Sequence, residues 1–268
     1  MAGMSQFSCP RGGDRPTDPW LALVIGNSRL HWAAFVGDRL QATWHTPHLV
    51  DQMPPEPQIP NGLGVALSHA RPLNLWIASV VPQQTDRWRA YPRHRLIHKD
   101  EIPIQGMYAS FGLDRALTLW GALVSVGSPV LVIDGGTALT LTAAVGPQLV
   151  GGAILPGLRL QQQSLHQSTA ALPWVDIAPE LPPRWAMNTP EAIGSGILYT
   201  VLAGLQDFMT DWRRMHPQGQ IVLTGGDGDR LCTWLQQRTL APMPTCQVDA
   251  DLMFRGLPYL GTALNPLE

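Results

Sequence analysis

Lysine is nearly absent from this chain of 268 residues, in which Lys99 is the only one. No glycine-rich loop precedes Lys99, so the sequence excludes a Walker-type nucleotide site, which needs a lysine at the end of such a loop. Any phosphate chemistry must therefore depend on backbone amides, hydroxyl groups, arginines and metal ions.

Charged residues are also scarce. They make up 14% of the chain, the formal net charge is -2, and no basic cluster interrupts the sequence, so nucleic acid is not an expected partner. Hydrophobic residues make up 45%, enough for a globular chain with one large or two small domains.

Cysteine is rare as well, and the three cysteines, Cys9, Cys232 and Cys246, are widely spaced without a CxxC pair. They imply neither a disulfide framework nor a zinc site, and they indicate a reducing, cytoplasmic setting. No apolar run reaches the roughly 18 to 20 residues that span a bilayer. Residues 1–18 are polar, lack the apolar core of a secretory signal, and are predicted to be a disordered lead.

A repeat is the most informative feature that the chain does contain. Residues 25–40 and 134–149 align without gaps at an offset of 109, with Ser28 falling on Thr137. Each copy follows a short apolar run that ends at glycine, which predicts a strand, a turn and a second strand. The repeat predicts two similarly built halves whose hairpin tips offer N–H groups and a hydroxyl to phosphates. Ordinary hairpin turns are the alternative. The identical pairs are Gly26/Gly135, Leu30/Leu139, Ala34/Ala143, Val36/Val145, Gly37/Gly146 and Leu40/Leu149.

The remaining pattern predicts an α/β chain with a boundary near residues 127–129, giving domains at 19–127 and 128–268. Residues 51–63 are rich in proline and predict a loop. Further strands are predicted at 41–45, 73–81, 95–98, 149–154 and 220–224, and helices at 112–124, 158–171, 190–216 and 230–237. In the longest helix, Thr189 is the predicted cap and Pro190 the first helical residue.

Two carboxylates are candidates for chemistry. Asp134 ends a buried strand beside two glycines, where a carboxylate is costly unless it holds a cation or accepts hydrogen bonds from the turn, and Thr137 is next to it. Asp114 begins a helix, where it can serve as a general base while Arg115 binds a substrate carboxylate. A helix cap beside a surface arginine is the alternative for Asp114.

Seven motifs in order cover about residues 20 to 260: GNS at 26–28, GLDR at 112–115, DGGTALT at 134–140, GGAILPGL at 151–158, STAALP at 168–173, NTPEAIGSG at 188–196 and LTGGD at 223–227. Together they resemble the type III pantothenate kinases. The resemblance implies the actin-like, sugar-kinase and Hsp70 ATPase fold, in which two ribonuclease-H-like domains hold ATP in the cleft between them. It also implies phosphorylation of pantothenate, with Mg²⁺ and a monovalent cation, K⁺ or ammonium, and a homodimer for which the apolar face of 190–216 is the candidate contact.

The resemblance assigns roles residue by residue. Asp114 is similar to the proton acceptor, Asp134 to the ligand of the monovalent cation, and Thr137 to an ATP contact. Gly225 and Gly226, which follow a strand and precede a helix, resemble the glycines on the adenosine side. The pantothenate-binding residues correspond to Tyr108, Gly112, Leu113, Asp114, Arg115 and Thr189. The first phosphate loop corresponds to Val24, Ile25, Gly26, Asn27, Ser28, Arg29, Leu30 and His31.

Two positions depart from the family pattern. Val24 replaces the aspartate that usually opens the first loop, and Tyr108 is only four residues before Gly112, closer than usual. The missing carboxylate leaves open a rival function, a catalytically inactive regulator that binds nucleotide or pantothenate. A small-molecule kinase with a different acceptor is the third alternative.

Overall fold

The computed structural model describes residues 18–50, 57–60, 72–238 and 245–260, which form two compact units. The first unit contains the described residues up to Gly127 and those from Asp251 onward, and the second runs from Ser128 to Ala250. The boundary predicted from the sequence instead puts residues 251–260 in the second half. Their contacts explain the difference, because the indole N–H of Trp120 donates to the carbonyl of Gly256 at 2.9 Å and the Thr43 hydroxyl to Asp251 at 2.8 Å.

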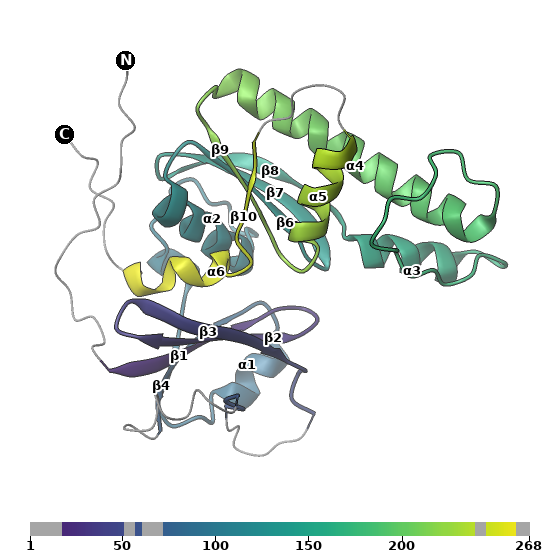
Figure 1. The fold of residues 1–268 in the computed structure, drawn as a ribbon. Helices are drawn as coiled ribbons and strands as arrows, with labels where there is room; N and C mark the ends of the chain where they lie inside the picture. The colour runs from purple at the N-terminus through teal and green to yellow at the C-terminus, as the bar shows by residue number, and fades with distance from the viewer. Residues whose placement is uncertain (1–17, 51–56, 61–71, 239–244, 261–268) are drawn as a thin grey trace. The chain divides into compact units, whose positions relative to one another are not determined.

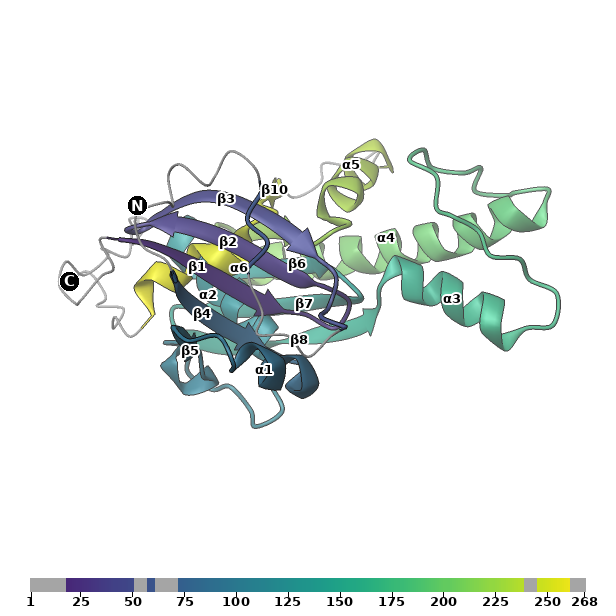
Figure 2. The same cartoon turned by 90° about the horizontal axis from the view of Figure 1, so that it is seen from below.

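The first unit is built on one five-stranded sheet. Its strand order is β3-β2-β1-β4-β5, visible in Figure 2, with β1, β4 and β5 parallel and β2 antiparallel to both of its neighbours. Five helical segments complete the unit. The bounds are β1 Pro19–Ile25, β2 Leu30–Val36, β3 Arg39–Thr46, β4 Asn74–Ser79, α1 Pro82–Trp88, β5 His94–Leu96, η1 Lys99–Glu101, α2 Leu113–Val126, α6 Leu252–Arg255 and η2 Leu257–Tyr259.

The second unit has a sheet of the same plan, β8-β7-β6-β9-β10. Three helices accompany this sheet, and Figure 1 shows α4 running along it. The bounds are β6 Val130–Gly135, β7 Ala138–Val145, β8 Gln148–Pro156, α3 Leu158–Ser168, α4 Thr189–Met215, β9 Gln220–Thr224, α5 Gly228–Arg238 and β10 Gln247–Val248.

The two sheets repeat each other in detail. In both, the first strand pairs antiparallel with the second and parallel with the fourth. The register between the second and third strands shifts after Ala34 in one and after Ala143 in the other, and Gly37 and Gly146 both have positive φ. The bulge positions and these glycines keep the offset of 109 found in the sequence, so the prediction of two similarly built halves is confirmed.

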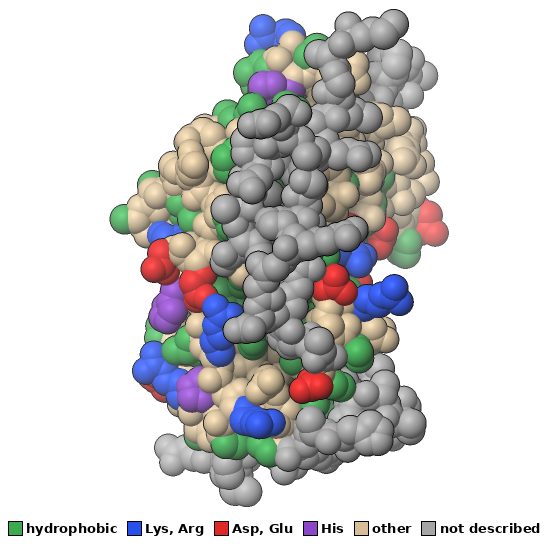
Figure 3. Space-filling view, turned by 90° about the vertical axis from the view of Figure 1, so that its left-hand side faces the viewer, with side chains coloured by type: hydrophobic (Ala, Val, Ile, Leu, Met, Phe, Trp, Pro, Cys, Tyr) green, Lys and Arg blue, Asp and Glu red, His purple; other side chains and the backbone are tan. Residues whose placement is uncertain are grey.

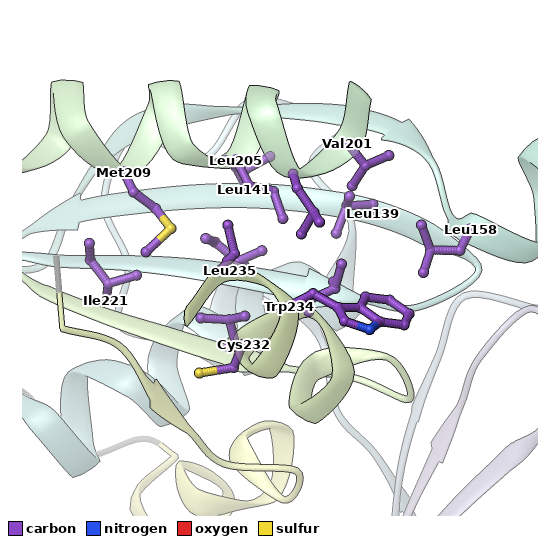
Figure 4. Packing of buried hydrophobic residues seen from close by; sticks show 14 of the residues in the cluster. Leu139, Leu141, Leu158, Val201, Leu205, Met209, Ile221, Cys232, Trp234 and Leu235 are labelled. Atoms are coloured by element: carbon purple, nitrogen blue, oxygen red, sulfur yellow. The ribbon is translucent and has the colours of Figure 1, made fainter. Parts of the chain in front are cut away.

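Each unit has its own apolar core. In the first unit, side chains from β1, β2 and β4 surround Trp32 and Trp88, whose rings are 4.9 Å apart. In the second, one face of the sheet packs against α4 and α5, as Figure 4 shows for Leu141, Leu205 and Trp234. By length and composition α4 is apolar enough to cross a membrane, although the sequence analysis found no such run. Its buried residues pack in this core, as expected for the core helix of a soluble protein.

Several predicted bounds move. The predicted helix at 158–171 ends at Ser168, where the chain enters a segment rich in proline. The cap of α4 is Asn188, whose side chain accepts the N–H of Glu191 at 3.0 Å, so Thr189 is the first helical residue and not the cap. The predicted lead, apart from residue 18, and most of the predicted loop at 51–63 lie outside the described residues.

Candidate active site

The first predicted phosphate loop is the turn between β1 and β2. The N–H of Gly26 donates to the carbonyl of Arg29 at 3.1 Å, and Asn27 to Arg29 are exposed. Val24, Ile25 and Leu30 are buried at the ends of the strands. Only the backbone and the exposed side chains of this turn are therefore available to a phosphate.

Three histidines surround this turn, and the sequence analysis had singled out only His31. Nε2 of His48 lies 2.8 Å from the carbonyl oxygen of Gly26, and the rings of His31 and His45 are 4.7 Å apart. Burial, followed by His45, Arg29 and His48 in that order, lowers the pKa of His31 to about 4. Burial followed by Arg29 also lowers the pKa of His45. His31 is therefore a neutral imidazole at neutral pH.

Val24, the position of the missing carboxylate, is in register with His31 and His45 on the neighbouring strands, so the three form one cross-strand row. Val24 is 3% exposed and is the cross-strand partner of His31, which in turn pairs with His45 across β2 and β3. Among the described residues, no group of three or more His, Cys, Asp or Glu side chains is arranged to hold a metal ion.

The predicted acceptor residues come together at the start of α2. Gly112 precedes the helix, and a carboxylate oxygen of Asp114 accepts the backbone N–H of Arg115 at 2.8 Å. The guanidinium of Arg115, which is 8% exposed, donates to the hydroxyl of Tyr108 at 3.1 Å and lies 4.8 Å from the ring of Phe111. The short spacing between Tyr108 and Gly112 therefore does not keep Tyr108 away from this group, and Leu113 is the first residue of the helix.

Lys99 supports the same group, a role that sequence reasoning missed. Its ammonium donates to the carbonyl oxygens of Tyr108 at 3.1 Å and Ala109 at 2.6 Å, which fixes the chain before α2. The one sign of this role in the sequence is that Lys99 is the only lysine, which by itself serves only to exclude a Walker site.

In the second unit, the ends of β6 and β9 bring Asp134 and Gly225 together. Gly225 has φ +80°, and a Cβ added to it would lie 2.3 Å from Oδ1 of Asp134. The N–H of Asp227 donates to the carbonyl of Gly135 at 2.9 Å, which fastens the two turns to each other. Burial raises the pKa of Asp227, although Arg230 at 3.5 Å opposes the shift.

Two hydroxyl residues flank Asp134 in the sheet and were also missed from the sequence. Asp134 pairs with Thr224 on β9 and with Thr140 on β7, so all three side chains point to one face. The Thr224 side chain is fully buried, and its Oγ1 has no hydrogen-bond partner among the residues that the structure describes. A buried hydroxyl without a partner is costly, and this one lies beside a carboxylate.

The remaining predicted residues are also in the second unit. Thr137 lies in the turn after Asp134, and its carbonyl accepts the N–H of Gly157 at 3.0 Å. Gly226 follows Gly225, and a Cβ added to it would meet nothing within 4 Å. Thr189 is exposed at the start of α4.

The paired sheets and their two turns define a class of protein, the phosphotransferases and ATPases of the actin-like, sugar-kinase and Hsp70 fold. The model of the family "Type III pantothenate kinase" matches residues 20–211. Type III pantothenate kinases from Nostoc and Synechocystis are 47% and 44% identical to the chain, covering 89% and 93% of it and 92% and 93% of those proteins. The chain belongs to the type III pantothenate kinase family.

A solved structure agrees on the fold. A Campylobacter jejuni protein of the Baf transcriptional-activator family superposes with a TM-score of 0.60 at 17% identity, over 88% of this chain and 94% of that one. As a member of its family the chain is an enzyme, a kinase that phosphorylates pantothenate in coenzyme A biosynthesis with ATP and a divalent metal. The predicted fold class and activity are thereby confirmed.

Proposed function

We propose that Asp114 is the general base that accepts the proton of the primary hydroxyl of pantothenate as that oxygen attacks the γ-phosphorus of ATP. One observation carries this assignment. The Asp114 carboxylate lies in the first turn of α2, fixed by the Arg115 N–H and beside a guanidinium that is itself held by Tyr108. A positioned carboxylate next to an anion-binding arginine suits an acceptor that carries both a hydroxyl and a carboxylate.

Arg115 serves in this proposal as the partner of the substrate carboxylate. Its guanidinium is oriented by Tyr108 and by the Phe111 ring, so little side-chain entropy is lost when it binds an anion. Gly112 and Leu113 form the entry to the helix, and Thr189 is a further pantothenate contact.

Each unit by itself offers groups that suit ATP: the turn between β1 and β2 in the first, and the turn after β6 with the glycines after β9 in the second. The exposed N–H groups and side chains of Asn27, Ser28 and Arg29 suit phosphate oxygens, as does the hydroxyl of Thr137. Gly226, where a Cβ would meet nothing within 4 Å, lets the nucleotide approach the backbone, and Gly225 before it shapes the turn on the adenosine side. Because phosphoryl transfer depends mostly on positioning and charge stabilisation, these donors contribute as much as the base.

A monovalent cation fits the row of Thr140, Asp134 and Thr224. Its oxygen donors are one carboxylate and two hydroxyls, and within the described part of the chain the Thr224 hydroxyl lacks a partner. Such hard oxygen ligands suit K⁺ or ammonium, and the ion when bound adds positive charge near the phosphates.

The rival functions have less support. The curated relatives compared here are named as kinases, and nothing favours an inactive regulator. An acceptor without a carboxylate would leave Arg115 without its proposed partner.

The direct test is ATP-dependent phosphorylation of pantothenate by the purified protein, with the product identified by mass. Mg²⁺ is supplied throughout, and K⁺ or Na⁺ is the only monovalent ion. We expect phosphopantothenate to form faster with K⁺. Binding of ATP or pantothenate without product would overturn the proposed reaction, and equal rates with both ions would overturn the cation site alone.

We further propose a cytoplasmic homodimer. The main apolar face of α4 packs within its own unit. Beside this face α4 lines a groove of about 240 Å³. Phe208, which is 47% exposed, lies at the rim of the groove. Apolar surface of this kind suits a self-complementary contact. Light scattering at micromolar concentration tests it, and a monomer mass would contradict it. The walls of the groove are Leu141, Leu155, Pro156, Gln161, Thr200, Val201, Gly204, Leu205 and Phe208.

A further inference from the structure

Two cysteines that are distant in the sequence meet in the second unit. Cys232 lies on α5 and Cys246 directly precedes β10, and their sulfur atoms are 3.0 Å apart. Both are free thiols. Their spacing in the sequence gave no sign of this contact, because residues 232 and 246 belong to different elements.

The position of Cys246 is fixed by the sheet and by α4. The next residue, Gln247, pairs with Val222 on β9, and the carbonyl of the preceding residue, Thr245, accepts the guanidinium of Arg213 at 3.2 Å. Cys232 is held in the middle of α5. The backbone on both sides is therefore fixed by secondary structure, and this holds the two sulfurs next to each other.

The hydrogen bonds make the two sulfurs unequal. Burial, followed by the hydrogen bond with Cys232, raises the pKa of Cys246 to about 12, so Cys246 keeps its proton. The side-chain amide of Gln236 donates to the Cys232 sulfur at 3.5 Å. The Cys232 sulfur thus has a polar partner, Gln236, besides Cys246. In Figure 4 the sulfur of Cys232 points away from the leucine side chains of the core.

We propose that Cys232 and Cys246 form a reversible disulfide when the protein meets a small hydroperoxide, with Cys232 as the attacking sulfur. The Cys232 thiolate attacks one peroxide oxygen, the O–O bond breaks, and a sulfenic acid forms while the other oxygen leaves as water or an alcohol. The Cys246 sulfur then attacks the Cys232 sulfur, the S–O bond breaks, and the hydroxyl leaves as water with the proton of Cys246. The two thiols together lose two protons and two electrons, which the peroxide takes up.

The disulfide would tie α5 to the edge strand of the sheet. It closes a loop of about 15 residues, and cross-links of that size restrict the unfolded chain. We expect the thermal midpoint of the oxidised protein to rise by about 5 to 10 °C and to return after reduction. This inference does not depend on the kinase activity.

The test is oxidation of the full chain with hydrogen peroxide, in a Cys9→Ser background that prevents cross-links through Cys9. We expect a mass loss of about 2 Da, with one linked peptide pair that contains Cys232 and Cys246. Both thiols free to alkylate after oxidation, or Cys232 carried to the sulfinic acid without a disulfide, would overturn the proposal.

Single variants test the order of attack. In Cys246→Ser, dimedone should trap a sulfenic acid at Cys232, whereas Cys232→Ser should give little adduct at Cys246. Gln236→Leu removes one donor from Cys232 and should slow oxidation several-fold. Equal trapping at both cysteines would contradict the assigned roles. If either variant fails to fold, the peptide map of the chain that keeps both cysteines still tests whether the disulfide forms.

Discussion

The turn between β1 and β2 and the turn between β6 and β7 follow the same backbone plan but carry different side chains. Strand order, pairing direction, bulge position and the glycines of positive φ agree at the offset of 109. Ile25 in the first copy corresponds to Asp134 in the second, and His31 corresponds to Thr140. The two copies therefore share their backbone geometry. At the compared positions the second copy has the oxygen donors of Asp134 and Thr140, whereas the first has the imidazole of His31.

The difference divides the chemistry between the units. In the second, a carboxylate and two hydroxyls share one strand row, which suits a cation. In the first, His31 pairs with Val24 and His45 in a neutral row that holds no carboxylate, and the candidate base Asp114 lies on α2. Charges of both signs are otherwise interspersed on the surface, as on the face shown in Figure 3. The predictions below change one unit at a time.

The largest effect is expected from Asp114→Asn in the first unit. The amide keeps the size of the side chain and can still accept the Arg115 N–H, but it cannot take a proton. We expect kcat to fall by about 10² to 10⁴ with little change in the KM of pantothenate. Steady-state kinetics at saturating ATP measures both constants.

The matched control is Asp207→Asn, because Asp207 is exposed on α4. It should retain wild-type kinetics. If Asp114→Asn keeps kcat within about tenfold of the wild type, Asp114 is not the base.

The next effect is expected in the second unit, from Gly225→Ala. The new methyl group meets the Asp134 carboxylate, and φ +80° is unfavourable for alanine. We expect a loss of about 2 to 4 kcal/mol in the free energy of unfolding, measured by denaturant titration. Gly226→Ala, which has open space, should cost less than about 1 kcal/mol, so equal losses in the two variants would show that the close approach is unimportant.

These residues also show how far the sequence leads. The repeat, the strands and the association of Asp114 with Arg115 followed from local pattern, since periodicity and glycine turns are written along the chain. Thr224, His48 and Lys99 did not, because their partners are distant in sequence and depend on sheet register. The cap of α4 was predicted one residue late, since asparagine and threonine are both good caps.

Exchanging His31 for the residue of the second unit, His31→Thr, tests the neutral row. A pKa lowered from 6.5 to about 4 means that between these values the unfolded chain binds a proton and the folded chain does not. Wild-type stability should therefore fall as the pH drops through this range, by at most about 2 kcal/mol at pH 5 compared with pH 7.5. Denaturant titration of His31→Thr at both pH values should lack this loss. The exposed control His166→Thr should keep the wild-type difference, and a wild-type difference in His31→Thr would reject the assignment.

The smallest effect, and the one with a sign opposite to most mutations, is expected from Thr224→Val. The variant keeps the shape and removes a buried hydroxyl without a partner, so in buffer without K⁺ the protein should gain about 1 kcal/mol of stability. The same change removes an oxygen donor beside Asp134, so K⁺ should stimulate the reaction less.

In the first unit, the buried Thr118 hydroxyl donates to the Asp114 carbonyl at 2.5 Å, and Thr118→Val should instead lose about 1 kcal/mol. If both variants lose stability, the Thr224 hydroxyl has a partner in solution. If only Thr224→Val gains stability while its K⁺ response is unchanged, the cation binds without it.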